Sequence, residues 1–162
     1  MKKRILTWLL AISMLGSLLT VPAGAAAVTK FSDVSDSYTA TAVESLRLMG
    51  VLDGYGDGTF RPDTVLNRAQ FCKMAVYAMD GSGELGRYST VTIFPDVKPS
   101  HWASSYINMA AKKGVISGFA DGKFKPEQTV TAGQAVTILM RGLGYKDENM
   151  GGVWPQSYMA EA

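Results

Sequence analysis

The 162-residue sequence contains one cysteine, one histidine and six prolines, and only 19% of its residues are charged. A lone cysteine, Cys72, cannot form an intramolecular disulfide. A structural zinc site needs about four soft ligands, and a Cys/His catalytic pair needs a third orienting group. His101 and Cys72 are too few for either, so we expect no metal site and no cofactor. Cys72 lies in an apolar helical stretch and is expected to act as a small buried hydrophobe.

The sequence also lacks a strong net charge, which is formally +2. Three basic residues at positions 2–4 precede an apolar run of about 15 residues, shorter than the ~20 that span a bilayer. Small residues follow, so residues 1–27 are predicted to be a signal peptide, cleaved after Ala25 or Ala27. Cleavage leaves 13 basic against 14 acidic residues. We therefore expect no nucleic-acid partner, and no membrane partner after signal cleavage.

The sequence repeats itself with an offset of 64 residues. Residues 50–70 align without a gap on residues 114–134, and eight of the 21 positions are identical. Upstream, residues 31–34 match residues 94–97. Periods of this size indicate a supersecondary unit that buries its apolar face against its neighbours.

Each unit is predicted to form a helix, a turn and a second helix. Apolar residues at three- and four-residue steps predict first helices that end at Gly50 and Gly114 as left-handed caps. Capping boxes that start at Asn67 and Thr131 predict the second helices. Glycines after these helices predict flexible connections. The residues expected to form the repeated structural motif are Asp33, Gly50, Asp57, Gly58, Pro62, Asp121, Gly122 and Pro126.

A third copy begins near the end of the sequence, where residues 154–162 overlay residues 102–110. The predicted organisation is a first repeat at 28–90, a second at 91–150 and the start of a truncated third at 151–162. An incomplete third unit would leave an apolar face exposed. We therefore expect that copies of the chain can associate through this unit.

These motifs resemble the S-layer homology (SLH) domain, whose units run F-x-D-V, G-[VI]-[IL]-x-G, D-G-x-F-x-P and a T-R-A-E-type helix start. The matching elements of the first unit begin at Phe31, Gly50, Asp57 and Asn67. The resemblance implies a mainly α fold, a pseudo-threefold helical bundle of three units with the third incomplete here. It also implies a secreted, non-catalytic module that anchors proteins to the bacterial cell wall or S-layer. The implied partner is a secondary cell-wall polysaccharide attached to peptidoglycan.

A pyruvylated sugar carries a carboxylate, for which arginine offers a charge-assisted, bidentate partner, and sugar C–H faces pack on aromatic rings. The resemblance therefore implies a groove lined by Arg68, Trp102, Asp96 and the turn 114–118. The full set of candidate polysaccharide-binding residues is Arg68, Trp102, Asp96, Gly114, Ser117, Gly118, Tyr38 and Trp154.

These candidates have structural alternatives. Arg68 could be a solvated surface charge, Trp102 could be partly core, and Asp96, like Asp33, could cap local backbone. In the second unit, Ala132 and Gly133 replace the motif's arginine and the residue after it, so a second groove would lack its anion-binding group.

Two alternative functions are calcium binding and hydrolysis of envelope polymers. The Asp- and Gly-rich turns resemble calcium loops of the EF-hand or dockerin type. Their twelfth positions are Thr64 and Gln128, where a bidentate carboxylate is required. An envelope-acting hydrolase would need paired catalytic carboxylates, whereas the acidic residues here repeat in both units as turn-formers. We therefore do not expect an enzyme.

Overall fold

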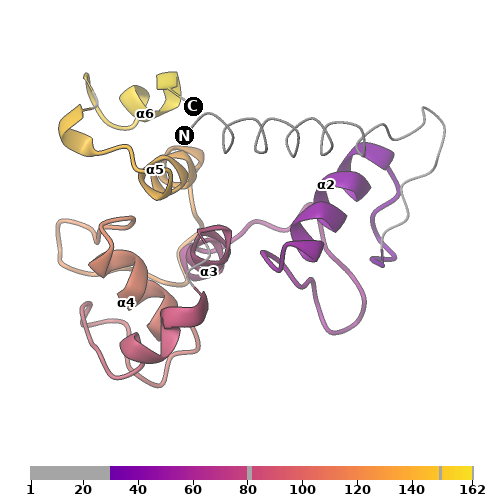
Figure 1. The fold of residues 1–162 in the computed structure, drawn as a ribbon, viewed down its shortest axis with the longest axis horizontal. Coiled ribbons are helices and arrows are strands. Elements are labelled where there is room, and N and C mark those ends of the chain that lie inside the picture. The colour runs from indigo at the N-terminus through magenta and orange to yellow at the C-terminus, as the bar shows by residue number, and fades with distance from the viewer. Residues whose placement is uncertain (1–29, 80–81, 150, 162) are drawn as a thin grey trace, which may run out of the picture.

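The computed structural model describes residues 30–79, 82–149 and 151–161, and is mainly helical, as predicted (Figure 1). No strand occurs among these residues, and the predicted signal peptide lies outside them. Within the same ranges, no helix has the length and apolar character needed to cross a membrane. The helices in order are α2 (Ser37–Leu48), α3 (Arg68–Ala78), η1 (Ser82–Tyr88), α4 (Ser104–Lys112), α5 (Ala132–Gly142), η2 (Asp147–Asn149) and α6 (Gln156–Glu161).

The helix starts confirm the predicted capping boxes. At α3, the Gln70 backbone N–H donates to the Asn67 side chain at 2.8 Å, and the Asn67 backbone N–H donates back to Gln70 at 2.9 Å. The same reciprocal pair forms between Thr131 and Gln134 at α5. These bonds satisfy donors that would otherwise be unpaired at the first turn of a helix, so both second helices begin where the sequence predicts.

The aspartate carboxylates of the F-x-D-V motif hold the turns between the helices. Asp96 accepts the backbone N–H groups of Phe124 and Lys125 at 2.9 and 2.7 Å, and Asp33 does the same for residues 60 and 61. Lys125 and its counterpart Arg61 adopt φ angles of 58° and 61°, which are unfavourable for residues with a side chain. Both aspartates therefore act as local backbone caps. This is the structural role that the sequence offers as the alternative to ligand binding.

The packing links each unit to the next one. Helix α3 packs against α4 and α5, and α5 packs against α6. The main core lies around α3 and α4 and contains Phe124, Ile107 and Cys72, which is fully buried as predicted. The connection after α3 differs from the flexible segment predicted. It forms η1, because its Leu85 and Tyr88 pack against this core.

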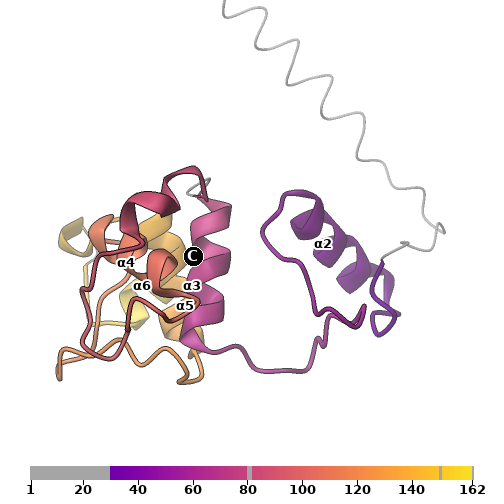
Figure 2. The ribbon, with the colours of Figure 1, turned by 90° about the horizontal axis from the view of Figure 1, so that it is seen from below.

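The first unit has a small core of its own. Its buried residues, Phe31, Val34, Ala40, Val43 and Leu52, form a cluster separate from the main core. Figures 1 and 2 show α2 standing apart from α3, joined to it by an extended stretch of chain. The second helix of the first unit is thus part of the main core, while its first helix and turn are not.

Candidate functional site

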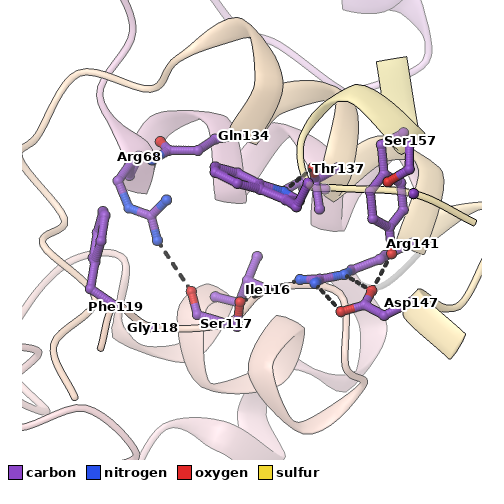
Figure 3. A pocket seen from close by; sticks show the side chains of 14 residues that line it. Arg68, Ile116, Ser117, Gly118, Phe119, Gln134, Thr137, Arg141, Asp147 and Ser157 are labelled. Carbon is purple, nitrogen blue, oxygen red and sulfur yellow. Dashed lines mark hydrogen bonds and ion pairs between the residues drawn. The ribbon is translucent and has the colours of Figure 1, made fainter. Parts of the chain in front are cut away.

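A cavity of about 510 Å³ lies between the two units and the C-terminal segment. The start of α3, the turn at 116–119, one face of α5 and the segment leading into α6 form its walls (Figure 3). We call it the first cavity. Its lining residues are Arg68, Ile116, Ser117, Gly118, Phe119, Gln134, Thr137, Ile138, Arg141, Asp147, Gly152, Trp154, Ser157 and Tyr158.

Arg68 forms one wall of the first cavity and is only 4% exposed. Its Nε donates to the Phe124 carbonyl at 2.8 Å and its Nη2 to the Ser117 carbonyl at 3.3 Å. The guanidinium carbon lies 4.7 Å from the Phe119 ring centroid. Burial lowers the pKa of Arg68, although an arginine stays charged at any ordinary pH. Within the described part of the chain no carboxylate is close enough for an ion pair with Arg68, so carbonyl dipoles, aromatic rings and the more distant charge of Asp96 balance this buried charge.

A second guanidinium lies across the cavity. Arg141 holds Asp147 with two bonds of 2.7 and 2.5 Å, and its Nη1 donates to the Ser117 hydroxyl at 3.4 Å. The Tyr158 hydroxyl donates to the same carboxylate. Hydrogen bonds from Arg141 and Tyr158 lower the pKa of Asp147, so it is ionised at neutral pH. Two guanidiniums against one carboxylate leave the cavity with a net positive charge.

An exposed aromatic ring borders the same cavity. Trp154 is 51% exposed, and its indole N–H donates to the Thr137 hydroxyl at 2.9 Å. Thr137 in turn donates to the Gly133 carbonyl at 2.7 Å. A Cβ on Gly133 would lie 2.8 Å from Pro155, so glycine at this position lets the C-terminal segment approach α5. The ring is thereby oriented with apolar surface left open, as sugar C–H faces require.

The structure brings together some of the predicted binding residues and separates others. Arg68, Ser117, Gly118 and Trp154 line the first cavity. Trp102, 53% exposed, lines a different cavity beside α3. The remaining candidates, Gly114, Asp96 and Tyr38, line neither cavity.

The predicted groove containing both Arg68 and Trp102 is therefore not the arrangement found. The two residues lie on different sides of α3. Trp102, in the loop before α4, lies in a cavity with Gln70 and Lys73, whereas Arg68 contacts the turn at 116–119.

Sequence reasoning missed the ionic group opposite Arg68. Arg141 closes α5, Asp147 starts η2 and Tyr158 lies in α6, so only folding brings them together. The one available signal was the alignment of residues 154–162 on residues 102–110, which pairs Tyr158 with Tyr106.

The second cavity, about 340 Å³, is the repeat-related counterpart of the first. Its lining includes most of the positions that lie 64 residues before the turn and helix residues of the first cavity, among them Asp53, Tyr55, Gln70 and Lys73. Lys73 pairs with Asp53 at 3.0 Å. Among the described residues, no guanidinium occupies the place that Arg68 takes in the first cavity.

The candidate calcium loops use their carboxylates internally. Asp57 accepts from Thr59 and from Arg61, whose Nη2 lies 2.7 Å away, and Asp121 pairs with Lys125 at 3.0 Å. Across the described ranges there is no group of three or more His, Cys, Asp or Glu side chains that could hold a metal ion.

The sequence matches a known family and several cell-surface proteins. The model of the S-layer homology domain matches residues 30–72 and 93–136. The chain is 33% identical over 138 residues to the Middle cell wall protein of Brevibacillus brevis, covering 84% of this chain and 13% of that protein. It is 32% identical over 155 residues to the Surface layer protein of Brevibacillus choshinensis, covering 92% and 14%. It is 31% identical over 115 residues to the Cellulosome-anchoring protein of Acetivibrio thermocellus, covering 70% and 26%.

The chain thus spans a small part of the length of these relatives. The part they share with it is a cell-surface anchoring module, located at the cell wall or surface layer. On the match to both repeats, this chain belongs to the S-layer homology domain family.

Proposed function

We propose that the first cavity binds a secondary cell-wall polysaccharide, non-covalently and without catalysis, through a carboxylate such as that of a pyruvylated sugar. The observation that carries this proposal is the buried guanidinium of Arg68, which has no carboxylate partner among the described residues. A buried cation without a counter-ion is costly, and an incoming anion would relieve that cost. This secondary polysaccharide is the polymer that is attached to peptidoglycan.

The other walls suit the rest of a sugar. Trp154 offers an apolar ring surface for C–H faces, and Ser157 offers a polar group for hydroxyls. The volume of about 510 Å³ lies within the range of small-ligand sites, roughly 300–1,000 Å³. The net positive charge would favour an acidic sugar over a neutral one.

Cell-wall sacculi provide the direct test. The chain should sediment with purified sacculi that retain polysaccharide and should stay in solution with stripped sacculi. Arg68→Ala should weaken retention about 10- to 100-fold, since a hydrogen bond to a charged group contributes about 1.5–3 kcal/mol. Arg61→Ala is the matched control, because it removes an arginine that lies outside the first cavity. Equal retention of the Arg68→Ala and Arg61→Ala variants would refute the assignment of the site.

A variant at the aromatic wall tests the sugar itself. Trp154→Ala should weaken retention about fivefold to tenfold through lost ring contact. Trp102→Ala, a tryptophan of similar exposure in the second cavity, serves as its control.

We further propose that copies of the chain self-associate through the end of α5 and the following segment, which resembles the start of a third unit. The support is an apolar surface on and after α5, where Leu139, Leu143 and Val153 are 46%, 75% and 78% exposed. Sedimentation velocity over a tenfold or larger concentration range tests this proposal. A compact monomer at every concentration would contradict it.

A further inference from the structure

Thr137 is a buried hydroxyl on the wall that α5 contributes to the first cavity (Figure 3). Its oxygen lies 2.7 Å from the Gly133 carbonyl and 2.9 Å from the indole nitrogen of Trp154. A hydroxyl has one proton, and an indole N–H can only donate. The Thr137 proton therefore goes to Gly133, and a lone pair of the same oxygen is turned toward Trp154.

Gly133 sets how closely the segment that carries Trp154 approaches α5. A Cβ at this position would lie 2.8 and 2.9 Å from two ring carbons of Pro155, which is too close for carbon atoms. Gly133 lies within α5 and does not have a positive φ, so the backbone conformation does not require a glycine. Glycine is also unfavourable in a helix. The approach of Pro155, the residue after Trp154, is thus the feature that requires it.

The repeat-related positions at the second cavity have different residues. The counterparts of Gly133 and Thr137, 64 residues earlier, are Ala69 and Lys73. An ammonium group has no acceptor for an indole N–H. Trp102 lines this cavity, and its indole N–H donates to no described residue. A tryptophan therefore borders each cavity, but a hydrogen bond ties its ring to the helix wall only in the first.

We propose that Thr137 and Gly133 are positioning residues that fix the ring of Trp154, and that they make the first cavity select a carboxylate borne on a sugar ring over a free carboxylate. The proposal rests on the function proposed above, in which Arg68 binds the carboxylate and Trp154 the C–H face. A ring that is already held in place loses less conformational freedom when the ligand binds. Only a ligand that has both the carboxylate and the sugar ring gains from it.

Two probes measure this selectivity by NMR titration of the full chain: a methyl glycoside that carries a pyruvyl ketal, and free pyruvate. Thr137→Val keeps the shape of the side chain but removes the acceptor. It should raise the Kd for the glycoside about threefold and leave the Kd for pyruvate unchanged. Thr137→Ser keeps the hydroxyl and should bind both probes as the parent does. Thr41→Val is the matched control, because Thr41 in α2 donates to the carbonyl four residues earlier and contacts no tryptophan.

A double variant shows whether Thr137 acts through Trp154. Trp154→Ala should raise the Kd for the glycoside about fivefold to tenfold, and Thr137→Val added to it should raise the Kd no further. Additive losses in the double variant would overturn the proposal. So would a Thr137→Val variant that binds the glycoside as tightly as the parent does.

The position of the ring can be read without a ligand. In the labelled full chain, the indole N–H of Trp154 should exchange with solvent about tenfold faster in Thr137→Val and in Gly133→Ala than in the parent. In Thr137→Ser it should exchange as in the parent. Circular dichroism checks that each variant is folded. An unchanged exchange rate in Thr137→Val would show that this hydrogen bond does not hold the ring, and would overturn the proposal.

Failure of this proposal can be told apart from failure of the proposed function. If the parent binds neither probe, the assignment of the polysaccharide site fails, and the selectivity fails with it. If the parent binds both probes and Thr137→Val weakens both equally, the site stands. The role of Thr137 in placing the ring is then wrong.

Discussion

The two units place the same motif in two different environments. In the second unit, Phe124 is fully buried beneath Arg68, which belongs to the preceding unit. In the first unit, Phe60 has no such cover among the described residues and is only partly buried. The motif itself therefore specifies a turn and a small core, and a buried guanidinium lines the cavity only in the unit whose turn is covered by the helix of a neighbouring unit.

The two units also differ at the position that Arg141 occupies in the second unit. Opposite Arg68, the first cavity holds the ionic group of Arg141 and Asp147. At the equivalent place in the first unit, Tyr77 and Tyr106 pair through their hydroxyls at 3.4 Å. Burial, together with the Tyr77 hydrogen bond, raises the pKa of Tyr106 to about 12, so Tyr106 is uncharged at neutral pH. The ionic group of Arg141 and Asp147 thus has a pair of tyrosine hydroxyls as its counterpart, while the charges that line the second cavity come from Asp53, Arg61 and Lys73.

Truncating the two equivalent phenylalanines should give the largest difference. Phe124→Ala should cost about 3–5 kcal/mol of unfolding free energy, because it leaves a cavity in the main core. Phe60→Ala should cost clearly less, since Phe60 is only partly buried. Urea unfolding followed by circular dichroism measures both. Equal losses would contradict the asymmetry between the units.

Removal of an arginine from each cavity should give the next largest difference in stability. Arg68→Ala should reduce the unfolding free energy by about 1.5–3 kcal/mol, because the Phe124 and Ser117 carbonyls lose their charged donor. Arg61→Ala should change the midpoint of unfolding little, since Arg61 is exposed. A variant at Arg68 as stable as the parent would show that the helix start is not held by this contact.

Neutralising Asp147, the carboxylate of the first cavity, should have a smaller effect. The effect should be on the affinity for polysaccharide rather than on stability. Asp147→Asn raises the positive charge of the cavity, so an acidic polysaccharide should bind about twofold to fivefold more tightly at low salt, and less so at high salt. Asp53→Asn, in the second cavity, is the control and should leave affinity unchanged. Isothermal titration at two salt concentrations checks both. Weaker binding of the Asp147 variant would mean that its carboxylate contacts the sugar.

The smallest expected effect is on acid stability. Hydrogen bonds from Thr59 and Arg61 lower the pKa of Asp57 from 3.8 to about 2 in the folded chain. The unfolded chain then binds more protons, so stability contributed by Asp57 is complete above about pH 5 and is lost as the pH falls toward 2. Asp57→Asn should flatten the dependence of Tm on pH in that window. An unchanged slope in thermal melts would contradict this account.

Much of the fold could be predicted from sequence because its signals are local. The capping boxes at Asn67 and Thr131 and the left-handed caps at Gly50 and Gly114, both with φ of 73°, lie within a few residues of the helix ends they set. The 3.6-residue period of apolar residues predicted the first helix of each unit. The 3₁₀ helix η1 was missed because tertiary packing, rather than local sequence, stabilises it.

The site was only half predictable because it forms between units. The motif match identified Arg68 and the turn at Ser117, and the third partial copy identified Trp154. The sequence could not show that Trp102 and Arg68 lie on different sides of α3. Nor could it show that Arg141 and Asp147 meet, since that pair depends on how the chain turns after α5.

The central claim is that the Arg68 guanidinium recognises a carboxylate of the wall polymer. The most direct measurement is titration of the full chain and of its Arg68→Ala variant with purified polysaccharide, before and after chemical removal of its pyruvyl groups. We expect removal to weaken binding of the parent about 10- to 100-fold and to leave the already weak binding of the variant unchanged. An equal loss in both proteins, or no loss in the parent, would contradict it.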